Sequence, residues 1–596
     1  MKKTYLYKNL VKGTAFGLAL LLGSCSAFDD FLTVYPTDTV TSEEFWEDKE
    51  ELTSVLASCY TQFLTSTVMD RMLIWGECRS DNFVLNSESN EDILNIMNAN
   101  LLPSNDWFDW AGFYTGIFYC NLVISKGDEM LESGVDASFS EDEWLPMRTE
   151  CRVLRALYYF YLIRAYRDVP LVTVATETSE GATDPIPQTP MEDVLTYLID
   201  DLEDCKDDAM LDYGNDVYNR GRITKDAAYT LLADLYLWRA AKNSSTDSVA
   251  KYPGQAEEDY ERCIELCDYV LAQKLEEFED ENEEHIGSSS ASASDEEYPL
   301  YECESRGRVT DTPYNEVFGE KNSLESIFEL QFDGSSNINN TVVSYYGGVS
   351  SGEVASGEFT GSVIVQDVSS SSDPTDYLYS ETDIRSVEAI MYRNSSTSSS
   401  AYQIMKYIAT DITVIDASDV WASDDEDNVE YENNRSQSTM DANWIVYRVS
   451  DVMLMKAEAL ACTAADGSSE MEEAYDLVRT LYERANPLME SEDYWSFSTY
   501  QTSETMLDLV MRERHREFYG EGKRWFDLVR IALRDGNTTS MLNLLSAKYT
   551  SNSSAIKAKL ATLNSLFNPV YEDEMDVNSA LVQNPAWDTE DTIVRN

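Results

Sequence analysis

The chain has 596 residues, and 43% of them are apolar, which is enough to bury a sizeable core. It carries 109 Asp and Glu against 44 Lys and Arg, and the formal net charge of −65 argues against nucleic acid or an anionic membrane surface as a partner of the whole molecule. Only two histidines are present, so zinc sites and catalytic triads that need several histidines are poorly supplied.

The first 25 residues predict export and lipidation. Four lysines precede an apolar run at residues 15–22 that is too short to span a bilayer, as in a bacterial export signal. The run ends in Leu22-Gly23-Ser24-Cys25, which is similar to a lipobox. Several acyl chains on the new terminal cysteine, at about 0.8 kcal/mol per buried CH₂, would anchor the protein stably. We therefore expect a signal peptide at residues 1–24 and lipidation of Cys25; secretion with an incidental cysteine is the alternative.

Aromatic side chains with polar neighbours indicate a ligand surface. They occur in LIWGECRSDN (73–82), in NDWFDWAGFY (105–114) at the start of a predicted helix, and in SYYGG (344–348), which we expect to be an exposed flexible loop. Aromatic faces stack on the C–H faces of sugar rings or on peptide side chains, and polar neighbours bond hydroxyls. Core packing is the alternative for each ring. The candidate ligand contacts are Trp75, Arg79, Asp81, Asn82, Trp107, Trp110, Tyr345 and Tyr346.

Helical periodicity dominates the chain. Apolar residues at three- and four-residue spacings predict amphipathic helices at residues 150–166, 191–205, 222–238, 260–273, 450–462 and 472–485. Thr224 is a suitable cap for the third of these. Helices of two to four turns pack in antiparallel pairs, so we predict a mostly α fold with tetratricopeptide-like pairs and no clean repeat. Alternation at residues 326–332 adds a short strand and minor β structure.

Long polar stretches separate the helices. Residues 274–298, 333–362, 369–400 and 422–434 are acidic or rich in Ser, Gly and Asn, and are predicted to be loops of a loop-rich second half. The acidic run Asp424-Asp425-Glu426-Asp427 offers oxygen ligands for Ca²⁺ but lacks the Gly and the terminal Glu of an EF-hand loop, which favours a solvated loop. We divide the mature chain into a helical region at 25–273, an insertion at 274–325 and a C-terminal region at 326–596.

The stretch MRERHREFYGEGKRWFDLVR, residues 511–530, gathers six Lys and Arg in an acidic protein. An anion site is one interpretation. The cations alternate with four Glu and Asp at helical spacings, however, and a helix capped by Ser503 would bring opposite charges together. We therefore predict a helix, a GEG turn and a second helix held by structural ion pairs.

Catalytic signatures are absent from the sequence. It contains no GxGxxG after a strand, no GxxxxGKS/T, no HExxH and no GxSxG. A glycosidase-like carboxylate pair is not diagnostic among 109 acids. Lipidation of Cys25 leaves nine cysteines at irregular spacings with no CxxC pair, so we expect most of them in the core. An oxidising compartment permits one or two disulfides, which the sequence does not assign.

Several motifs occur in a fixed order along the chain. They are LRALYYFYLIRAYRDVPLV (154–172), GRITKDAAYTLLADLYL (221–237), Asp383-x-Arg385, Lys406-Tyr407, YRVSDVMLMKAEAL (447–460), the stretch at 511–530 and NPVYEDEMDVNSALVQNPAW (568–587). Together they resemble the motifs of the SusD/RagB family of outer-membrane nutrient-binding lipoproteins of Bacteroidetes. The resemblance runs from Cys25 nearly to the C-terminus, and Asp29 and Asp30 resemble the family's surface-export signal. One departure is Asn568-Pro569-Val570 in place of the usual Pro-Ile-Pro.

The resemblance implies a non-catalytic, surface-exposed lipoprotein of the outer membrane with a SusD-like α/α fold and no cofactor. It implies docking on a SusC-like TonB-dependent transporter and delivery of a captured glycan. A peptide-capturing relative is the first alternative, a surface glycoside hydrolase the second, and a cytoplasmic helical-repeat scaffold, which the export signal contradicts, the third. Ligand residues vary within the family, so the eight candidate contacts rest on local chemistry.

Overall fold

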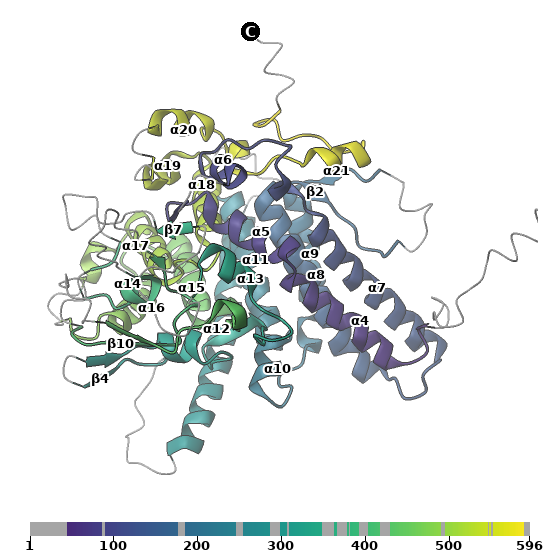
Figure 1. The fold of residues 1–596 in the computed structure, drawn as a ribbon, viewed down its shortest axis with the longest axis horizontal. Coiled ribbons are helices and arrows are strands. Elements are labelled where there is room, and N and C mark those ends of the chain that lie inside the picture. Colours follow the sequence, from purple (N-terminus) through teal and green to yellow (C-terminus); the bar gives the residue numbers. More distant parts are fainter. Residues whose placement is uncertain are drawn as a thin grey trace, which may run out of the picture.

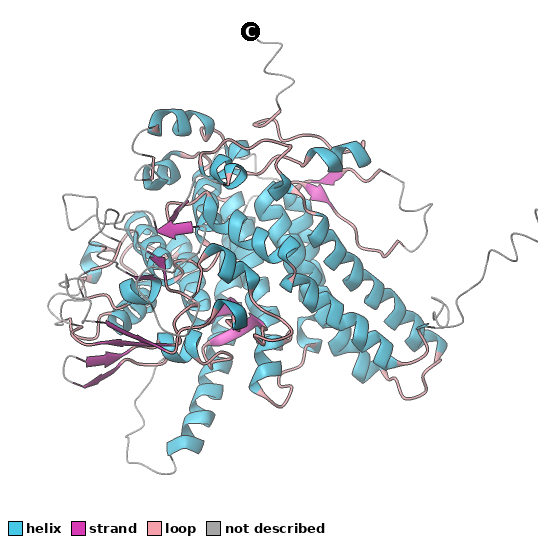
Figure 2. Ribbon diagram, viewed as in Figure 1, coloured by secondary structure: helices cyan, strands magenta, loops and turns pink. Residues whose placement is uncertain are grey.

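We describe a computed structural model of the chain. It describes residues 45–85, 90–176, 185–245, 254–286, 298–306, 309–348, 363–365, 378–380, 382–391, 403–417, 429–489, 495–545, 548–549 and 552–588. The signal peptide, Cys25 and the acidic run at 424–427 lie outside these ranges. Helices make up most of the described structure, and the strands are short (Figure 2).

The N-terminal half is a series of antiparallel helices in which α4 contacts α7, α7 contacts α8, and α8 contacts α9 (Figure 1). The helices of this half are α4 (Lys49–Thr61), α5 (Ser66–Leu73), α6 (Glu91–Met97), α7 (Ala111–Ser133), α8 (Glu141–Tyr166), α9 (Met191–Cys205), α10 (Asp216–Gly221), α11 (Lys225–Asn243) and α12 (Gln255–Ile286). Helix α9 has the bounds that we predicted from periodicity, 191–205. The predicted cap of α11 is also confirmed, because the Thr224 side chain accepts a hydrogen bond from the Ala227 amide. The mostly α, pairwise-packed fold is therefore confirmed.

The C-terminal half continues this helical array. Helix α15 contacts α12, α16 and α17, and α18 contacts α11 of the N-terminal half. The helices are α13 (Asn340–Tyr345), α14 (Arg385–Ala389), α15 (Val449–Thr463), α16 (Ser469–Ala485), α17 (Ser503–Glu517), α18 (Arg524–Asp535), α19 (Thr539–Leu545), α20 (Ser553–Lys559) and α21 (Glu572–Val577). The cap of α17 is Thr502, and the predicted Ser503 is its first residue.

All strand pairs of the described structure are antiparallel. One sheet has four strands in the order β11-β10-β5-β4, and the other pairs are β1-β7, β12-β6, β2-β3 and β8-β9. The predicted strand at 326–332 is β6, which is buried on both faces. The strands are β1 (Phe83–Leu85), β2 (Val169–Pro170), β3 (Gln188–Thr189), β4 (Glu304–Arg306), β5 (Val309–Asp311), β6 (Ser326–Leu330), β7 (Val363–Val365), β8 (Ile390–Met391), β9 (Gln403–Ile404), β10 (Asp411–Val414), β11 (Val429–Glu432) and β12 (Trp444–Arg448).

Two of the predicted loop boundaries are wrong. Helix α12 continues through the expected boundary at 273 to Ile286, so the first part of the acidic stretch 274–298 is helical. Its backbone extends beyond the body at the lower edge of Figure 1. The stretch 333–362 contains helix α13, which starts where the Asn339 side chain accepts from the Val342 amide. A high content of Glu is compatible with an exposed helix as well as with a loop, which is why composition misplaced the end of α12.

None of the described helices combines the length and apolar content needed to cross a membrane. Within the described ranges, no group of three or more His, Cys, Asp or Glu side chains is arranged to hold a metal ion. The nine described cysteines are free, and seven of them are buried, as core packing predicted.

Candidate functional site

The predicted contact Trp75 lies in the core. It belongs to a π-helix, η2 (Ile74–Cys78), that follows α5, and only 2% of its surface is exposed. Its ring stacks on Phe113 with 4.9 Å between centroids, and its indole N–H donates to the Trp107 carbonyl at 2.9 Å. One face and the polar edge thus have partners within the protein, and the ring is almost fully buried, so the interpretation of Trp75 as a ligand contact is corrected to core packing.

The polar candidates Arg79, Asp81 and Asn82 are bonded to the C-terminal half. Arg79 donates to the carbonyls of Leu566 at 2.6 Å and Ser565 at 2.7 Å. The Asp81 carboxylate pairs with Arg524 at 2.8 Å. Asn82 lies within 2.6 Å of the His515 ring nitrogen, and its carbonyl accepts from the Tyr519 hydroxyl. These groups are used to hold the fold together, and their assignment to a ligand is corrected accordingly.

We call the contact between residues 75–82 and residues 511–530 the clasp. Its tightest point is a backbone crossing, where a Cβ on Gly76 would lie 1.9 Å from the Gly522 carbonyl oxygen. The buried Glu77 carboxylate accepts from the Gly522 amide at 3.0 Å. Burial raises the pKa of Glu77 to about 7, although the Asn82 amide and the Gly522 N–H oppose this rise. The GEG turn therefore allows the backbone at Gly522 to approach the backbone at Gly76 closely.

The tyrosine pair Tyr345 and Tyr346 is buried, in contrast to the exposed loop that we predicted. Tyr345 ends helix α13, and the two side chains are 4% and 2% exposed. The Tyr346 hydroxyl donates to the Gly520 carbonyl at 2.6 Å, which adds a third segment to the clasp region. Ring packing against Phe83 and Tyr407 explains the burial. The expectation that these tyrosines lie over a ligand is corrected.

The tryptophans Trp107 and Trp110 lie at the entrance to α7. Trp107 is half-buried in the single turn η3 (Asp106–Phe108), with the Arg71 guanidinium 5.5 Å from its ring centroid. Trp110 is the residue before α7, and its ring packs edge-on against Tyr166 at 4.8 Å. Most of Trp110 is covered, but its remaining surface borders an open groove.

We call this depression, of about 390 Å³, the α7 groove. Its floor follows one face of α7, where aromatic rings recur every four residues at positions 110, 114 and 118, and its wall is Glu574 from α21. Figure 1 shows α21 beside the end of α7 and the β2 strand. Phe118 is 36% exposed. The size is that of a small-ligand site. The lining residues are Trp110, Ala111, Tyr114, Thr115, Phe118, Tyr119 and Glu574.

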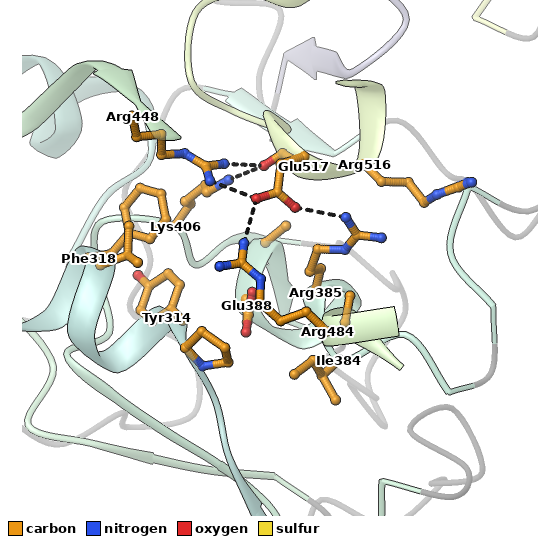
Figure 3. A pocket seen from close by; sticks show the side chains of 14 residues that line it. Tyr314, Phe318, Ile384, Arg385, Glu388, Lys406, Arg448, Arg484, Arg516 and Glu517 are labelled. Atoms are coloured by element: carbon orange, nitrogen blue, oxygen red, sulfur yellow. Dashed lines mark hydrogen bonds and ion pairs between the residues drawn. The ribbon is translucent and has the colours of Figure 1, made fainter. Parts of the chain in front are cut away.

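A second cavity lies inside the C-terminal half. Figure 3 shows Arg385, Arg448 and Arg484 converging on the Glu517 carboxylate, while Arg516 points away from it. The nearest contact, from Arg448 Nη1, is 2.6 Å. Burial opposes ionisation of Glu517, but the three guanidinium groups hold its pKa well below the usual range. The space has about 30 Å³, which is room for about one water molecule.

Five of the six cations of the stretch 511–530 thus pair with carboxylates of the protein, and the sixth, Arg512, is exposed. Arg514 pairs with Asp527, Arg524 with Asp81, and Arg530 with Glu458 and Asp527. The predicted structural ion pairing is confirmed, and the anion-site interpretation is not supported. Of the predicted contacts, the structure brings only Trp110 to the α7 groove. The spacing of Trp110, Tyr114 and Phe118 was a usable signal, but nothing in the sequence places Glu574 beside them.

Comparison with known proteins agrees with this architecture. A family model described as the SusD family matches residues 366–587, and a second, described as "Starch-binding associating with outer membrane", matches residues 30–237. The chain belongs to the SusD/RagB family. SusD-like protein P38 of Formosa agariphila is 24% identical over 539 residues, covering 89% of this chain and 92% of that protein. A SusD-like protein of Bacteroides ovatus is 26% identical over 226 residues, 38% of this chain and 39% of that protein.

Solved SusD structures share the fold. The Bacteroides fragilis protein NanU superposes with a TM-score of 0.62 at 18% identity, covering 93% of this chain and all of that one. A laminarin-binding SusD-like protein gives 0.59 at 21% identity, covering 90% of this chain and 99% of that one. Because both lie below a quarter identity, they establish the SusD-like fold alone. The clasp joins segments from the two halves that the family models match separately.

Proposed function

We propose that this SusD-like chain is a surface lipoprotein of the outer membrane that binds a glycan and delivers it to a SusC-like TonB-dependent transporter. The observation that carries the proposal is the family membership of both halves, one of them through a family described as starch-binding and associating with the outer membrane. The laminarin-binding relative of the same fold supports a glycan as the ligand. Catalysis is not part of the proposal.

The α7 groove is the binding surface that we propose. It is an open concavity of about 390 Å³ with four aromatic side chains, and aromatic rings stack on the apolar faces of sugars. Trp110 and Tyr114 lie 5.8 Å apart between ring centroids, and Phe118 and Tyr119 lie 6.0 Å apart. The groove therefore offers contacts to more than one ring of a glycan chain. Trp107, which is half-buried and does not belong to the lining, remains a predicted ligand contact.

Affinity gel electrophoresis against a panel of polysaccharides tests this proposal. We expect retardation of the wild-type protein by at least one polysaccharide and loss of about 1 kcal/mol of binding in Phe118→Ala, since an aromatic contact of an exposed ring is worth about that much. Val135→Ala, another exposed apolar residue just beyond α7, is the matched control and should bind normally. Binding of peptides with no retardation by any polysaccharide would support the peptide-capturing alternative, and turnover of a labelled glycan would support a hydrolase.

The anchoring step has a separate test. Cys25 is the residue that would carry the acyl chains, and it lies outside the described residues. Radiolabelled palmitate should enter the wild-type protein and should not enter Cys25→Ala. Incorporation into the variant would remove the basis for the membrane anchor while leaving the glycan-binding proposal in place.

A further inference from the structure

In the α7 groove, more hydrogen-bond acceptors than donors are available to a ligand. The Tyr114 hydroxyl donates to the Pro170 carbonyl at 2.7 Å, and the Thr115 hydroxyl donates to the Ala111 carbonyl at 2.9 Å. The Trp110 indole N–H is directed to the Glu574 carboxylate, where it opposes the rise in pKa that burial causes. Three of the four side-chain donors of the lining are thus directed to groups of the protein, and the Tyr119 hydroxyl is the fourth. The oxygens of the same hydroxyls and the carboxylate still accept, since each has further lone pairs.

The charges that line the groove also favour a ligand that donates hydrogen bonds. Glu574 is the one Asp, Glu, Lys or Arg among the lining residues, so no positive side chain faces the groove. Burial raises the pKa of Glu574, the Trp110 N–H opposes this, and the nearby charges of Asp109 and Asp573 raise it further. A carboxylate held beside aromatic rings and among other carboxylates is stabilised by a cation more than by a neutral ligand.

We propose that the α7 groove recognises a protonated amino group on a glycan, as in a chain that contains unacetylated amino sugars. This inference rests on the proposed function and specifies its ligand class. An ammonium brings three donors and no acceptor, which suits a lining that keeps several acceptors and in which the Tyr119 hydroxyl is the one side-chain donor without a partner in the described structure. It also gains from aromatic faces nearby, because their quadrupoles attract cations. Uronic and sulfated glycans bring acceptors and negative charge, and are excluded for the same reasons.

A glycan is favoured over a lysine-bearing peptide by the shape of the site. The aromatic side chains follow α7 over two helical turns, from Trp110 to Phe118, with the single carboxylate at one end. A helix rises about 1.5 Å per residue, so these positions span roughly 12 Å, which is longer than one ammonium group needs. The rings beyond the carboxylate then pack against the C–H faces of the sugars that follow.

The test compares two oligosaccharides with the same backbone. Isothermal titration calorimetry of the full mature protein is run with a β-1,4-linked glucosamine pentamer and with its fully N-acetylated counterpart, at about pH 6, where the amines are protonated. We expect the glucosamine pentamer to bind about tenfold more tightly, which is the size of one cation–aromatic and carboxylate contact. Added salt should reduce this preference, because the charged partners are partly solvent-exposed.

The variant Glu574→Gln should abolish the preference and its salt dependence, with about a tenfold loss of affinity for the glucosamine pentamer. Asp576→Asn removes the same charge from an exposed position on the same helix outside the lining, and should leave the preference intact. Equal binding of the two pentamers, unchanged by Glu574→Gln, would overturn the inference while the proposed glycan binding stands. Binding of a lysine-bearing peptide but of neither sugar would overturn the inference, and it would overturn the proposed glycan binding as well if no polysaccharide of the panel retarded the protein.

Discussion

Glu517 shows why the most basic stretch of an acidic protein is structural. Its carboxylate accepts from Arg385, Arg448 and Arg484, which come from three different segments, and all four side chains are largely buried. Removing the Glu517 charge takes one counter-charge from three buried guanidinium groups at once, and each then has only its other carboxylate partners, such as Asp383, Glu521 and Glu325. We expect Glu517→Gln to lower the free energy of unfolding by about 3–5 kcal/mol, measured by urea denaturation.

The matched control for this change is Glu483→Gln. Glu483 pairs with Arg479 one helical turn away, on an exposed face of α16. Exposed pairs of this kind contribute only about 0.3–0.5 kcal/mol, so the control should be close to wild type. Equal losses in the two variants would show that the network around Glu517 does not act as a buried cluster.

The buried His515 side chain is expected to make the stability of the protein depend on pH. Burial and the neighbouring charge of Arg524 lower its pKa to about 3, although Asp81 opposes the shift. In the unfolded chain the same ring takes a proton near pH 6.5, about the ordinary value for histidine. Between these pH values the unfolded state binds more protons than the folded state, so the contribution of His515 to stability is full above about pH 6.5 and falls as the pH drops toward 3.

A variant and a spectroscopic readout check this expectation. In His515→Gln, which keeps an N–H donor for Asn82, the pH dependence of the unfolding free energy between about pH 6 and 4 should be flatter than in wild type. Labelling histidine for NMR should show a resonance that does not titrate between about pH 8 and 5. Two resonances that both titrate near the ordinary pKa would contradict burial of His515 in the clasp.

At the scale of elements, sequence periodicity located several long helices, although it did not find the end of α12, and it did not predict the contacts between helices. Helices α8, α9, α11, α15 and α16 bury one or more apolar stripes, and such stripes are visible in sequence. The tyrosines at 345 and 346 were misplaced because a Gly-rich, polar context predicted a loop, while tertiary packing against Tyr407 decided their burial. The groove wall Glu574 lies far along the chain from α7, and only the fold brings the two together.

The π-helix η2 and the GEG turn provide a test at the same scale. A Cβ at position 76 would lie 1.9 Å from the Gly522 oxygen, so Gly76→Ala forces two backbones apart. Overpacking of this kind costs about 1–3 kcal/mol, and loss of the Glu77 contact to the turn adds to it. Urea denaturation should therefore show a destabilisation of about 2–4 kcal/mol.

Gly467→Ala is the control for this variant. Nothing lies within 4 Å of a Cβ there, and the backbone φ of +69° alone disfavours a side chain. A single residue in this left-handed region costs about 1–2 kcal/mol. If Gly76→Ala were no more destabilised than Gly467→Ala, the close approach at the clasp would not limit the fold.

At the scale of the whole molecule, the two halves form one packed structure. Helix α12 contacts both α11 and α15, and α18 packs on α11. The Tyr447 hydroxyl donates to Asp234 at 2.9 Å, and the Asn568 amide donates to the Ala165 carbonyl at 2.7 Å. Composition suggested a boundary at residue 273. That boundary lies inside helix α12, and separating the chain there would expose the residues that make these contacts.

This arrangement predicts that the halves do not fold independently. Residues 25–273 expressed alone lack α15, α18 and the whole C-terminal side of the clasp, and thus expose the apolar faces of α11 and α12. We expect this fragment to show no cooperative thermal transition by circular dichroism, because the buried area that offsets its conformational entropy is missing. A chain that ends at residue 588 keeps every described contact and should unfold like the full protein. A cooperative transition in the fragment would mean that α12 and the clasp join two domains that are each stable without the other.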